Sequence, residues 1–143
     1  MIYFDTSFLV SAYLADANSL RAKAYLSSVT EPLPFTTLHR LEMRNAFHLA
    51  VFQRRVEPDN SAAAIDDVEN DIRRGQLRPT AVVWNEVFEQ ATLLSMHSLT
   101  LGCRSLDLLH VAAAKSLSAD AFVTFDDRQR ALANQAGLSI EPV

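Results

Sequence analysis

Acidic side chains are the residues of this sequence whose type and spacing could support chemistry. Asp5 directly follows a short apolar run, and Asp126 comes soon after a second apolar run near the other end of the chain. Asp107 stands in the first turn of an apolar helix-forming segment, where the helix dipole favours a negative charge. Glu42 lies about one turn into another helix-forming segment, beside its apolar stripe. Each acid taken alone is also typical of a cap, a strand end or a solvated rim.

Taken together, the four acids indicate a metal site. Carboxylates held close together repel one another unless a cation lies between them, and oxygen ligands suit Mg²⁺ or Mn²⁺ rather than zinc. A pair of such ions about 3.5–4 Å apart can cleave a phosphodiester, because one activates a water and the other stabilises the leaving oxygen. Hydroxyl groups that flank the acids are candidates to orient ligands or waters. They belong to Thr6, Ser7, Ser105 and Thr124.

The elements that must position these acids alternate between strands and helices. This alternation predicts an α/β fold with a parallel sheet, in which reactive groups gather beyond the C-terminal ends of the strands. Residues 81–83 are ambiguous between a strand and the entry to a helix. Strands are expected at 2–4, 33–35, 121–124 and 139–143. Helices are expected at 8–15, 18–28, 37–55, 84–98, 106–117 and 127–136, with Ser105 as the N-cap of the 106–117 helix. One more helix is expected to begin at Asp59 or Ser61 and to end at Gly75. The apolar stripe of the 37–55 helix is expected to comprise Leu38, Leu41, Ala46, Leu49 and Phe52.

Composition limits the class of protein. The chain has 143 residues, of which 49% are hydrophobic, so we expect a single domain over residues 1–143 with one sizeable core. A single cysteine, Cys103, excludes an intramolecular disulfide and favours a cytoplasmic location. No apolar run is long enough for a membrane span, and the first residues lack the basic region of a signal peptide. The three isolated glycines cannot form a Gly-rich phosphate loop.

The net charge argues against a broad nucleic-acid-binding face. It is −4, whereas proteins that bind nucleic acid through such a face are usually basic. Arginine nevertheless supplies 11 of the 13 basic residues, and arginine suits bidentate contact with phosphate. Arg104, Arg128 and Arg130 are candidate substrate contacts, although surface solvation explains them equally well. His110 is expected to be a core histidine bonded to a backbone carbonyl.

The sequence around the four acids resembles the PIN-domain family, in particular the VapC toxins of prokaryotic toxin–antitoxin pairs. Any one motif is weak, but together they follow the family order over the whole chain. The resemblance rests on Ile-Tyr-Phe-Asp5-Thr6-Ser7-Phe-Leu-Val, on Glu42 in its helix, on Ser105-Leu-Asp107-Leu-Leu-His110-Val-Ala-Ala-Ala, and on Ala-Phe-Val-Thr124-Phe-Asp126-Asp127-Arg-Gln.

This resemblance implies a three-layer α/β/α domain with a short, mainly parallel central sheet. It implies a Mg²⁺- or Mn²⁺-dependent endoribonuclease that uses one or two ions and hydrolyses RNA as the toxin of a toxin–antitoxin pair. It also implies a homodimer, a cognate antitoxin as partner, and no membrane association. The implied catalytic and metal residues are Asp5, Glu42, Asp107 and Asp126, supported by Thr6, Ser7, Thr124 and Asp127.

Two choices stay open at this point. Asp126 and Asp127 are adjacent, and we prefer Asp126 as the fourth acid because it is nearer the end of its strand. The alternative function is a catalytically silent module that docks a basic partner peptide in its acidic groove. A receiver-like phosphoacceptor is set aside, because neither Lys23 nor Lys115 follows a predicted strand.

Overall fold

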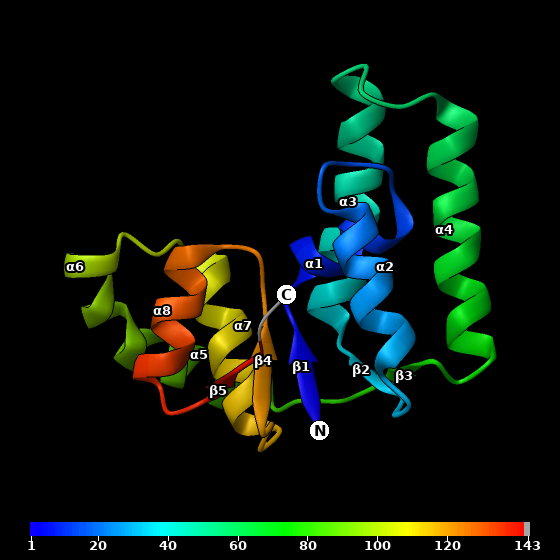
Figure 1. The fold of residues 1–143 in the computed structure, drawn as a ribbon. Helices are drawn as coiled ribbons and strands as arrows, with labels where there is room; N and C mark the ends of the chain where they lie inside the picture. Colours follow the sequence, from blue (N-terminus) through cyan, green and yellow to red (C-terminus); the bar gives the residue numbers. More distant parts are fainter. Residues whose placement is uncertain (142–143) are drawn as a thin grey trace. The chain divides into compact units, whose positions relative to one another are not determined.

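The computed structural model describes residues 1–141, which form two compact units (Figure 1). The first contains Met1–Asp5 and the described residues from Ala81 onward, and the second contains Thr6–Thr80. The strands of both units are parallel, so the predicted helix-rich α/β class with a short parallel sheet is confirmed. None of the described helices is both long and apolar enough to cross a membrane.

The first unit is built on a three-stranded sheet in the order β1-β4-β5 (Figure 1). Its strands are β1 (Ile2–Phe4), β4 (Ala121–Val123) and β5 (Ser139–Ile140), and the rest of the strand predicted at 139–143 includes residues 142–143, which lie outside the described residues. The sheet is buried through aromatic contacts: the Tyr3 ring stacks on Phe122 with 5.7 Å between centroids. The helices of this unit are α5 (Trp84–Leu94), a 3₁₀ turn η1 (Ser95–His97), α6 (Ser98–Leu101), α7 (Ser105–Ser116) and α8 (Asp127–Gln135).

Helix α7 is the central helix of this unit. It packs against α5 and α8, and α8 lies in turn against β4 and β5. The nearly all-apolar sequence of α7 predicts a buried helix, and every residue from Asp107 to Ala114 is buried. Its N-cap is Arg104 rather than the expected Ser105, because the Asp107 side chain accepts the backbone N–H of Arg104 at 2.8 Å.

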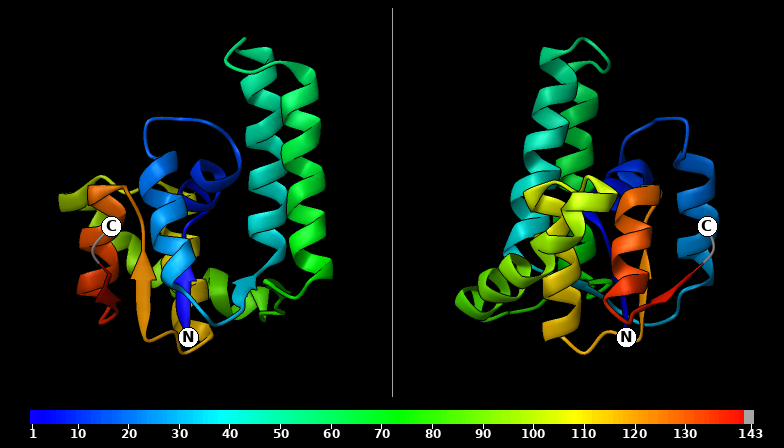
Figure 2. Two further views of the ribbon diagram at one scale, coloured as in Figure 1. Left: turned by 45° about the vertical axis from the view of Figure 1, so that its right-hand side comes forward. Right: turned by 90° about the vertical axis from the view of Figure 1, so that its left-hand side faces the viewer.

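The second unit combines the parallel pair β2 (Leu33–Phe35) and β3 (Leu77–Pro79) with four helices. Helices α3 and α4 lie side by side, as both views in Figure 2 show. The remaining two, α1 and α2, pack against each other, and α1 also contacts α3. The four helices are α1 (Thr6–Tyr13), α2 (Ser19–Ser28), α3 (Thr37–Phe52) and α4 (Pro58–Arg73).

The buried face of α3 differs from the predicted stripe. Leu41, Leu49 and Phe52 are exposed, and the buried face instead comprises Leu38, His39, Met43, Phe47 and Ala50. At 100° per residue the exposed Leu41, Leu49 and Phe52 centre on the side of the helix opposite the buried residues that follow Leu38, and the half-buried Ala46 lies between the two sides. The prediction failed because a polar residue, His39, lies in the buried stripe. Its Nδ1 accepts the backbone N–H of Thr36 at 3.0 Å, which completes the N-cap of the helix.

Other boundaries also differ from the sequence predictions. Strand β3 was missed, because it contains an arginine and a proline and gains its order from pairing with β2. Residues 81–83 are neither strand nor helix, and the helix predicted at 84–98 divides into α5, η1 and the start of α6. Helix α4 has Glu57 rather than Asp59 or Ser61 as its N-cap, with Pro58 in the first turn. Helix α1 begins at Thr6, two residues before the predicted start.

Candidate active site

The ends of β1 and β4 place Asp5 at one edge of the three-stranded sheet. Phe4 is in register with Val123, and the backbone N–H of Asp5 donates to the Val123 carbonyl at 3.0 Å. Asp5 and Thr124, the residues that follow the two strands, are both buried. The strands therefore run parallel and end together, as the placement of Asp5 in the sequence predicts.

Asp126 is fixed by the turn between β4 and α8. Its backbone N–H donates to Thr124 Oγ1 at 3.0 Å. Its Oδ1 caps α8 by accepting the backbone N–H groups of Arg128 at 2.8 Å and Gln129 at 3.1 Å. Because the cap uses Oδ1, the second oxygen, Oδ2, is the one that faces the neighbouring arginines. Thr124 thus supports Asp126 through the backbone.

Asp107 is held in a similar way in the first turn of α7. Its Oδ2 accepts the backbone N–H of Arg104 at 2.8 Å, which stabilises the start of the helix. The same oxygen lies 3.4 Å from Arg104 Nε, and Oδ1 lies 3.5 Å from Arg104 Nη2. Asp107 is buried, whereas the Arg104 side chain is 70% exposed.

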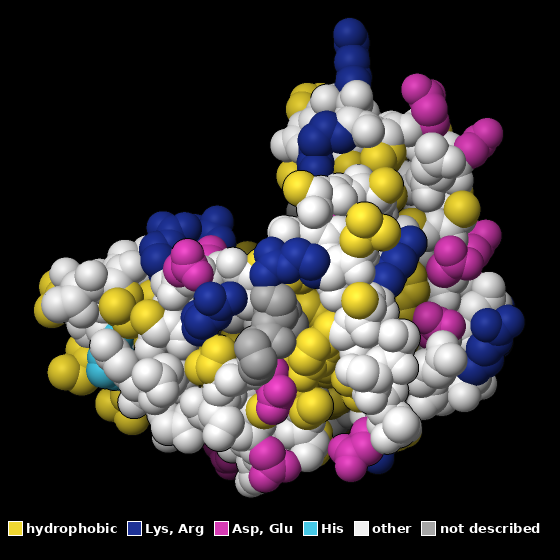
Figure 3. All heavy atoms as spheres, viewed as in Figure 1, with side chains coloured by type: hydrophobic (Ala, Val, Ile, Leu, Met, Phe, Trp, Pro, Cys, Tyr) yellow, Lys and Arg dark blue, Asp and Glu magenta, His cyan; other side chains and the backbone are white. Residues whose placement is uncertain are grey.

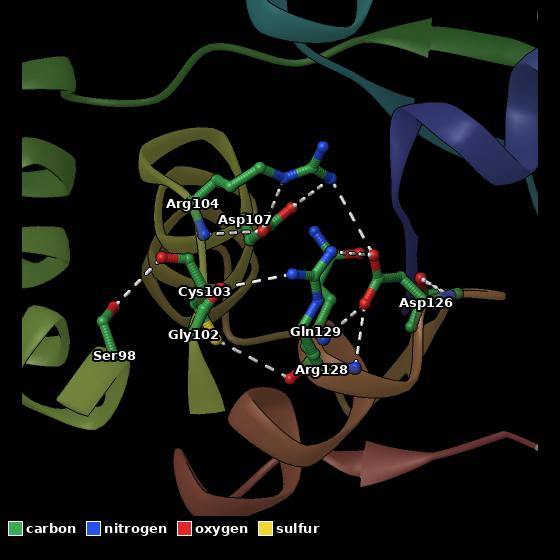
Figure 4. Close-up of polar contacts among 9 residues, drawn as sticks. Ser98, Gly102, Cys103, Arg104, Asp107, Asp126, Arg128 and Gln129 are labelled. Carbon is green, nitrogen blue, oxygen red and sulfur yellow. Dashed lines mark hydrogen bonds and ion pairs between the residues drawn. The ribbon is translucent and has the colours of Figure 1, made fainter. Parts of the chain in front are cut away.

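Arg104 joins the two carboxylates, as Figure 4 shows. Its Nη2 lies 3.8 Å from Asp126 Oδ2, and Nη2 of Arg128 lies at the same distance from that oxygen. The space-filling view in Figure 3 shows the result on the surface: Lys and Arg side chains lie beside Asp and Glu side chains over the N-terminal end of α8. The structure therefore brings Asp107 and Asp126 together through one guanidinium group.

The loop that carries Arg104 is tied to its surroundings. Gly102 ends α6 with φ of 65°, a left-handed conformation that favours glycine, and its carbonyl accepts from Arg128 at 3.5 Å. The Cys103 carbonyl accepts from Ser98 Oγ at 3.2 Å, and its thiol lies 3.8 Å from the Arg128 carbonyl. Burial, together with the negative charges of Asp107 and Asp126, raises the pKa of the Cys103 thiol, so this cysteine is not an activated nucleophile.

Gln129 is a polar residue of this region that sequence reasoning missed. It is buried, and its Oε1 has no hydrogen-bond partner among the described residues. Figure 4 shows Gln129 beside Arg128 and Asp126 in the first turn of α8. The spacing Asp126-x-x-Gln129 is that of a capping box, in which the glutamine would bond the Asp126 N–H. Thr124 Oγ1 takes that N–H instead, so the amide oxygen is left over.

Asp127 does not join this group. It is the first residue of α8, its side chain is 90% exposed, and it pairs with Arg130 at 3.1 Å. Arg130 also donates to the Thr124 carbonyl at 3.1 Å. The structure thus separates the two adjacent acids, with Asp126 directed to Arg104 and Asp127 to the surface.

The remaining predicted residues belong to the second unit. Thr6, the first residue of α1, donates from Oγ1 to Glu42 Oε2 at 3.1 Å. Glu42 is half-buried, and Thr6 is buried. Ser7 is exposed, and its carbonyl accepts from Ser11 Oγ at 3.1 Å. The hydroxyl of Thr6 is therefore placed to orient a carboxylate.

His110 lies in the core of the first unit. It is buried, and a hydrogen bond of 3.0 Å joins its Nδ1 to the hydroxyl of Tyr3. The predicted core position is thus correct, and the Tyr3 hydroxyl in β1 is one hydrogen-bond partner of the ring.

The carboxylate and amide oxygen atoms of these residues are ligands of the type that a hard divalent cation prefers. Asp5 and Asp107 are buried carboxylates, the Asp126 side chain is 25% exposed, and Gln129 adds an amide oxygen without a partner. Oxygen ligands of this kind suit Mg²⁺ or Mn²⁺. Within residues 1–141, however, no group of three or more histidine, cysteine or acidic side chains is arranged around a common point for a metal ion.

Several solved structures of other proteins have a similar fold. A crystal structure of VapC20 from Mycobacterium tuberculosis, described as a toxin that cleaves the sarcin–ricin loop, superimposes with a TM-score of 0.68 at 22% identity, over 92% of this chain and 94% of that one. FitAcB from Neisseria gonorrhoeae gives a TM-score of 0.65 at 17% identity, over 99% and 97% of the two chains. FitAB bound to an IR36 DNA fragment gives 0.68 at 20% identity, over 99% and 94%. At these identities the likeness concerns the fold.

The sequence itself carries the family assignment. No curated protein sequence matches the chain at a significant level. The family model of the PIN domain, in contrast, matches residues 2–135, which is nearly the whole chain and includes all four predicted acids. This protein therefore belongs to the PIN-domain family.

Proposed function

We propose that this protein is a divalent-metal-dependent endoribonuclease and the toxin of a toxin–antitoxin pair. The observation that carries the proposal is the meeting of Asp107 and Asp126 at one guanidinium group, in a chain of the PIN-domain family. Asp5 supports it from the end of β1, the strand that pairs with β4. The likeness of the fold to VapC20, described as an RNA-cleaving toxin, points to the same class of reaction.

In this proposal Asp5, Glu42, Asp107 and Asp126 bind one or two Mg²⁺ or Mn²⁺ ions. The bound metal supplies a lower pKa for an attacking water and positive charge for the leaving oxygen. Carboxylates act as ligands, and hydrolysis needs no covalent enzyme intermediate. The products are a 5′-phosphate and a 3′-hydroxyl. We propose a single domain over residues 1–143 in a cytoplasmic protein.

The side chains around the acids have their own tasks in this scheme. The α8 cap uses one oxygen of Asp126 and leaves the other for a ligand, and the α7 cap does the same for Asp107. Thr6 orients Glu42, and Thr124 orients Asp126 through its backbone. Arg128 lies next to these acids and is a candidate contact for an RNA phosphate.

The test is divalent-dependent RNA cleavage by Asp5→Asn and Asp107→Asn variants. Both retain the size of the side chain and remove its charge, so we expect cleavage of transfer, ribosomal or messenger RNA fragments to be lost. Asp127→Asn is the matched control, because its side chain is 90% exposed and pairs with Arg130 instead. Full activity of both buried-acid variants would exclude this site.

A partner and a second copy complete the proposal. We propose a cognate antitoxin that blocks the acidic groove, and a homodimer. Large apolar side chains exposed on helices of both units offer contact surface: they include Leu41 and Phe52 in α3, and Leu93 in α5. Co-expression with the product of an adjacent short reading frame should abolish the ribonuclease activity. Light scattering on the purified chain would measure its oligomeric state.

A second candidate function is the silent module that docks a basic peptide. The observation in its favour is that guanidinium groups already contact Asp107 and Asp126. Calorimetric titration with Mn²⁺ separates the two functions, because only the nuclease takes up Mn²⁺ through these carboxylates. Uptake that disappears in Asp107→Asn supports the nuclease, and no uptake by the wild-type chain supports the module.

A further inference from the structure

Each of the two carboxylates has one oxygen committed to a helix and one facing Arg104. Asp126 uses Oδ1 for the two N–H groups of the α8 cap, and its Oδ2 lies 3.8 Å from Arg104 Nη2. Asp107 uses Oδ2 for the Arg104 backbone N–H, and this oxygen also lies 3.4 Å from Arg104 Nε, whereas Oδ1 lies 3.5 Å from Arg104 Nη2. The guanidinium group thus lies beside both oxygen atoms that the two caps leave available, and it also contacts the capping Oδ2 of Asp107.

A divalent cation held by this pair must use the same oxygen atoms. Withdrawing Asp126 Oδ1 or Asp107 Oδ2 from its cap would leave backbone N–H groups at a helix start without acceptors, which destabilises the helix. The other oxygen of each acid carries no such cost, but Arg104 neutralises it. A guanidinium group and a divalent cation repel each other, so the presence of one at these oxygen atoms weakens the binding of the other.

The ion pairs of the Arg104 side chain are weak enough for another cation to replace it. Its side chain is 70% exposed, and its distances to the two acids are 3.4–3.8 Å, so solvent screens the pair strongly. The α7 cap uses the backbone N–H of Arg104 and the side chain of Asp107. The guanidinium group can therefore leave without opening the helix.

We propose that Arg104 is a built-in counter-ion of Asp107 and Asp126 that competes with the divalent cation and so sets the metal affinity of the site. This inference rests on the proposed function, since it assumes a cation at these carboxylates. Arg104 is a positioning residue in this role: it holds the two acids together in the metal-free chain and raises the cation concentration needed to replace it.

The experiment is isothermal titration of the full chain with Mn²⁺ at low ionic strength. We expect Arg104→Gln to bind Mn²⁺ about 1.4- to fivefold more tightly than wild type, the range set by the strength of exposed ion pairs. Arg104→Lys, which keeps the charge but loses the planar fork, should lie between the two. The advantage of Arg104→Gln should shrink as NaCl is raised, because salt screens the competing arginine.

Lys115→Gln is the matched control. Lys115 is exposed in the last turn of the same helix, about 16 Å along its axis from Arg104, and its ammonium group donates to the backbone carbonyl of Ala136. The Lys115→Gln variant loses one positive charge, as Arg104→Gln does, but away from the two carboxylates, so its Mn²⁺ affinity should equal that of wild type. Equal gains in both variants would mean that net charge alone sets the affinity, which would overturn the proposal for Arg104.

The outcomes separate this inference from the proposed function. If wild type binds Mn²⁺, Asp107→Asn does not, and Arg104→Gln binds as wild type does or more weakly, the metal site stands and the role of Arg104 is refuted. If no variant binds Mn²⁺, both proposals fail. Circular dichroism of each variant ensures that only folded chains are compared.

Discussion

Asp107 has a structural role that can be measured apart from any catalysis. It caps α7 and pairs with Arg104, so its removal should cost stability as well as activity. Asp107→Ala removes the cap acceptor, worth about 1 kcal/mol, and a charge at a helix start, worth roughly 0.3–1 kcal/mol. The exposed partner Arg104 adds less than about 1 kcal/mol after screening. We therefore expect a loss of about 2 kcal/mol.

Asp107→Asn should lose about half as much. Its amide oxygen can still accept the Arg104 N–H, so only the charge-dependent part disappears. Urea denaturation in EDTA gives the two free energies of unfolding. Thermal denaturation should show shifts of about 3–6 °C per kcal/mol for a chain of this size. If Asp107→Asn proves as stable as wild type or more so, the repulsion among the acids exceeds the stabilisation by Arg104 and the helix, and this reasoning is wrong.

Three further predictions concern the rest of the molecule. Burial and the hydrogen bond to Asp71 raise the pKa of the Tyr13 hydroxyl far above its usual value of about 10. Its contribution to stability is therefore complete below pH 10 and falls above it by up to roughly 1.4 kcal/mol per pH unit. In urea titrations from pH 8 to 11, the Tyr13→Phe variant should lack this fall in the free energy of unfolding. Phe47→Ala should cost about 3–5 kcal/mol by denaturation, whereas Phe52→Ser, on the exposed side of α3, should change stability by less than about 0.5 kcal/mol. Thr36→Ala should cost about 1–2 kcal/mol, and Thr36→Ser much less, because the serine hydroxyl can keep the cap.

The sheet edge could be predicted from sequence because its signals are local and agree with one another. Short runs of β-forming residues, each followed soon by an acid, locate β1 and β4, and a parallel arrangement then places both C-terminal ends together. The register between Phe4 and Val123 agrees with this expectation. The family motifs add the order of the four acids along the chain.

Features that depend on tertiary contacts could not be predicted in the same way. Two apolar stripes run along α3, and the choice between them depends on His39, whose cap bond with Thr36 allows a polar ring to be buried. Strand β3 forms only because β2 lies beside it. The surroundings of Arg104 and Gln129 depend on how the N-terminal ends of α7 and α8 pack together, which no spacing along the sequence encodes.

The pairing of β1 with β4 has a consequence for folding. Ile2 pairs with Ala121, a residue that is synthesised 119 positions later, which takes roughly 6–24 s at 5–20 residues per second. Both strands of the second unit lie within residues 6–80, so that sheet can form in the meantime. During this interval the apolar segment of β1 lacks β4, the strand with which it pairs, and unpaired apolar strands are prone to mispairing and aggregation. Synthesis rate and chaperone access therefore bear on the yield of this protein through its first strand.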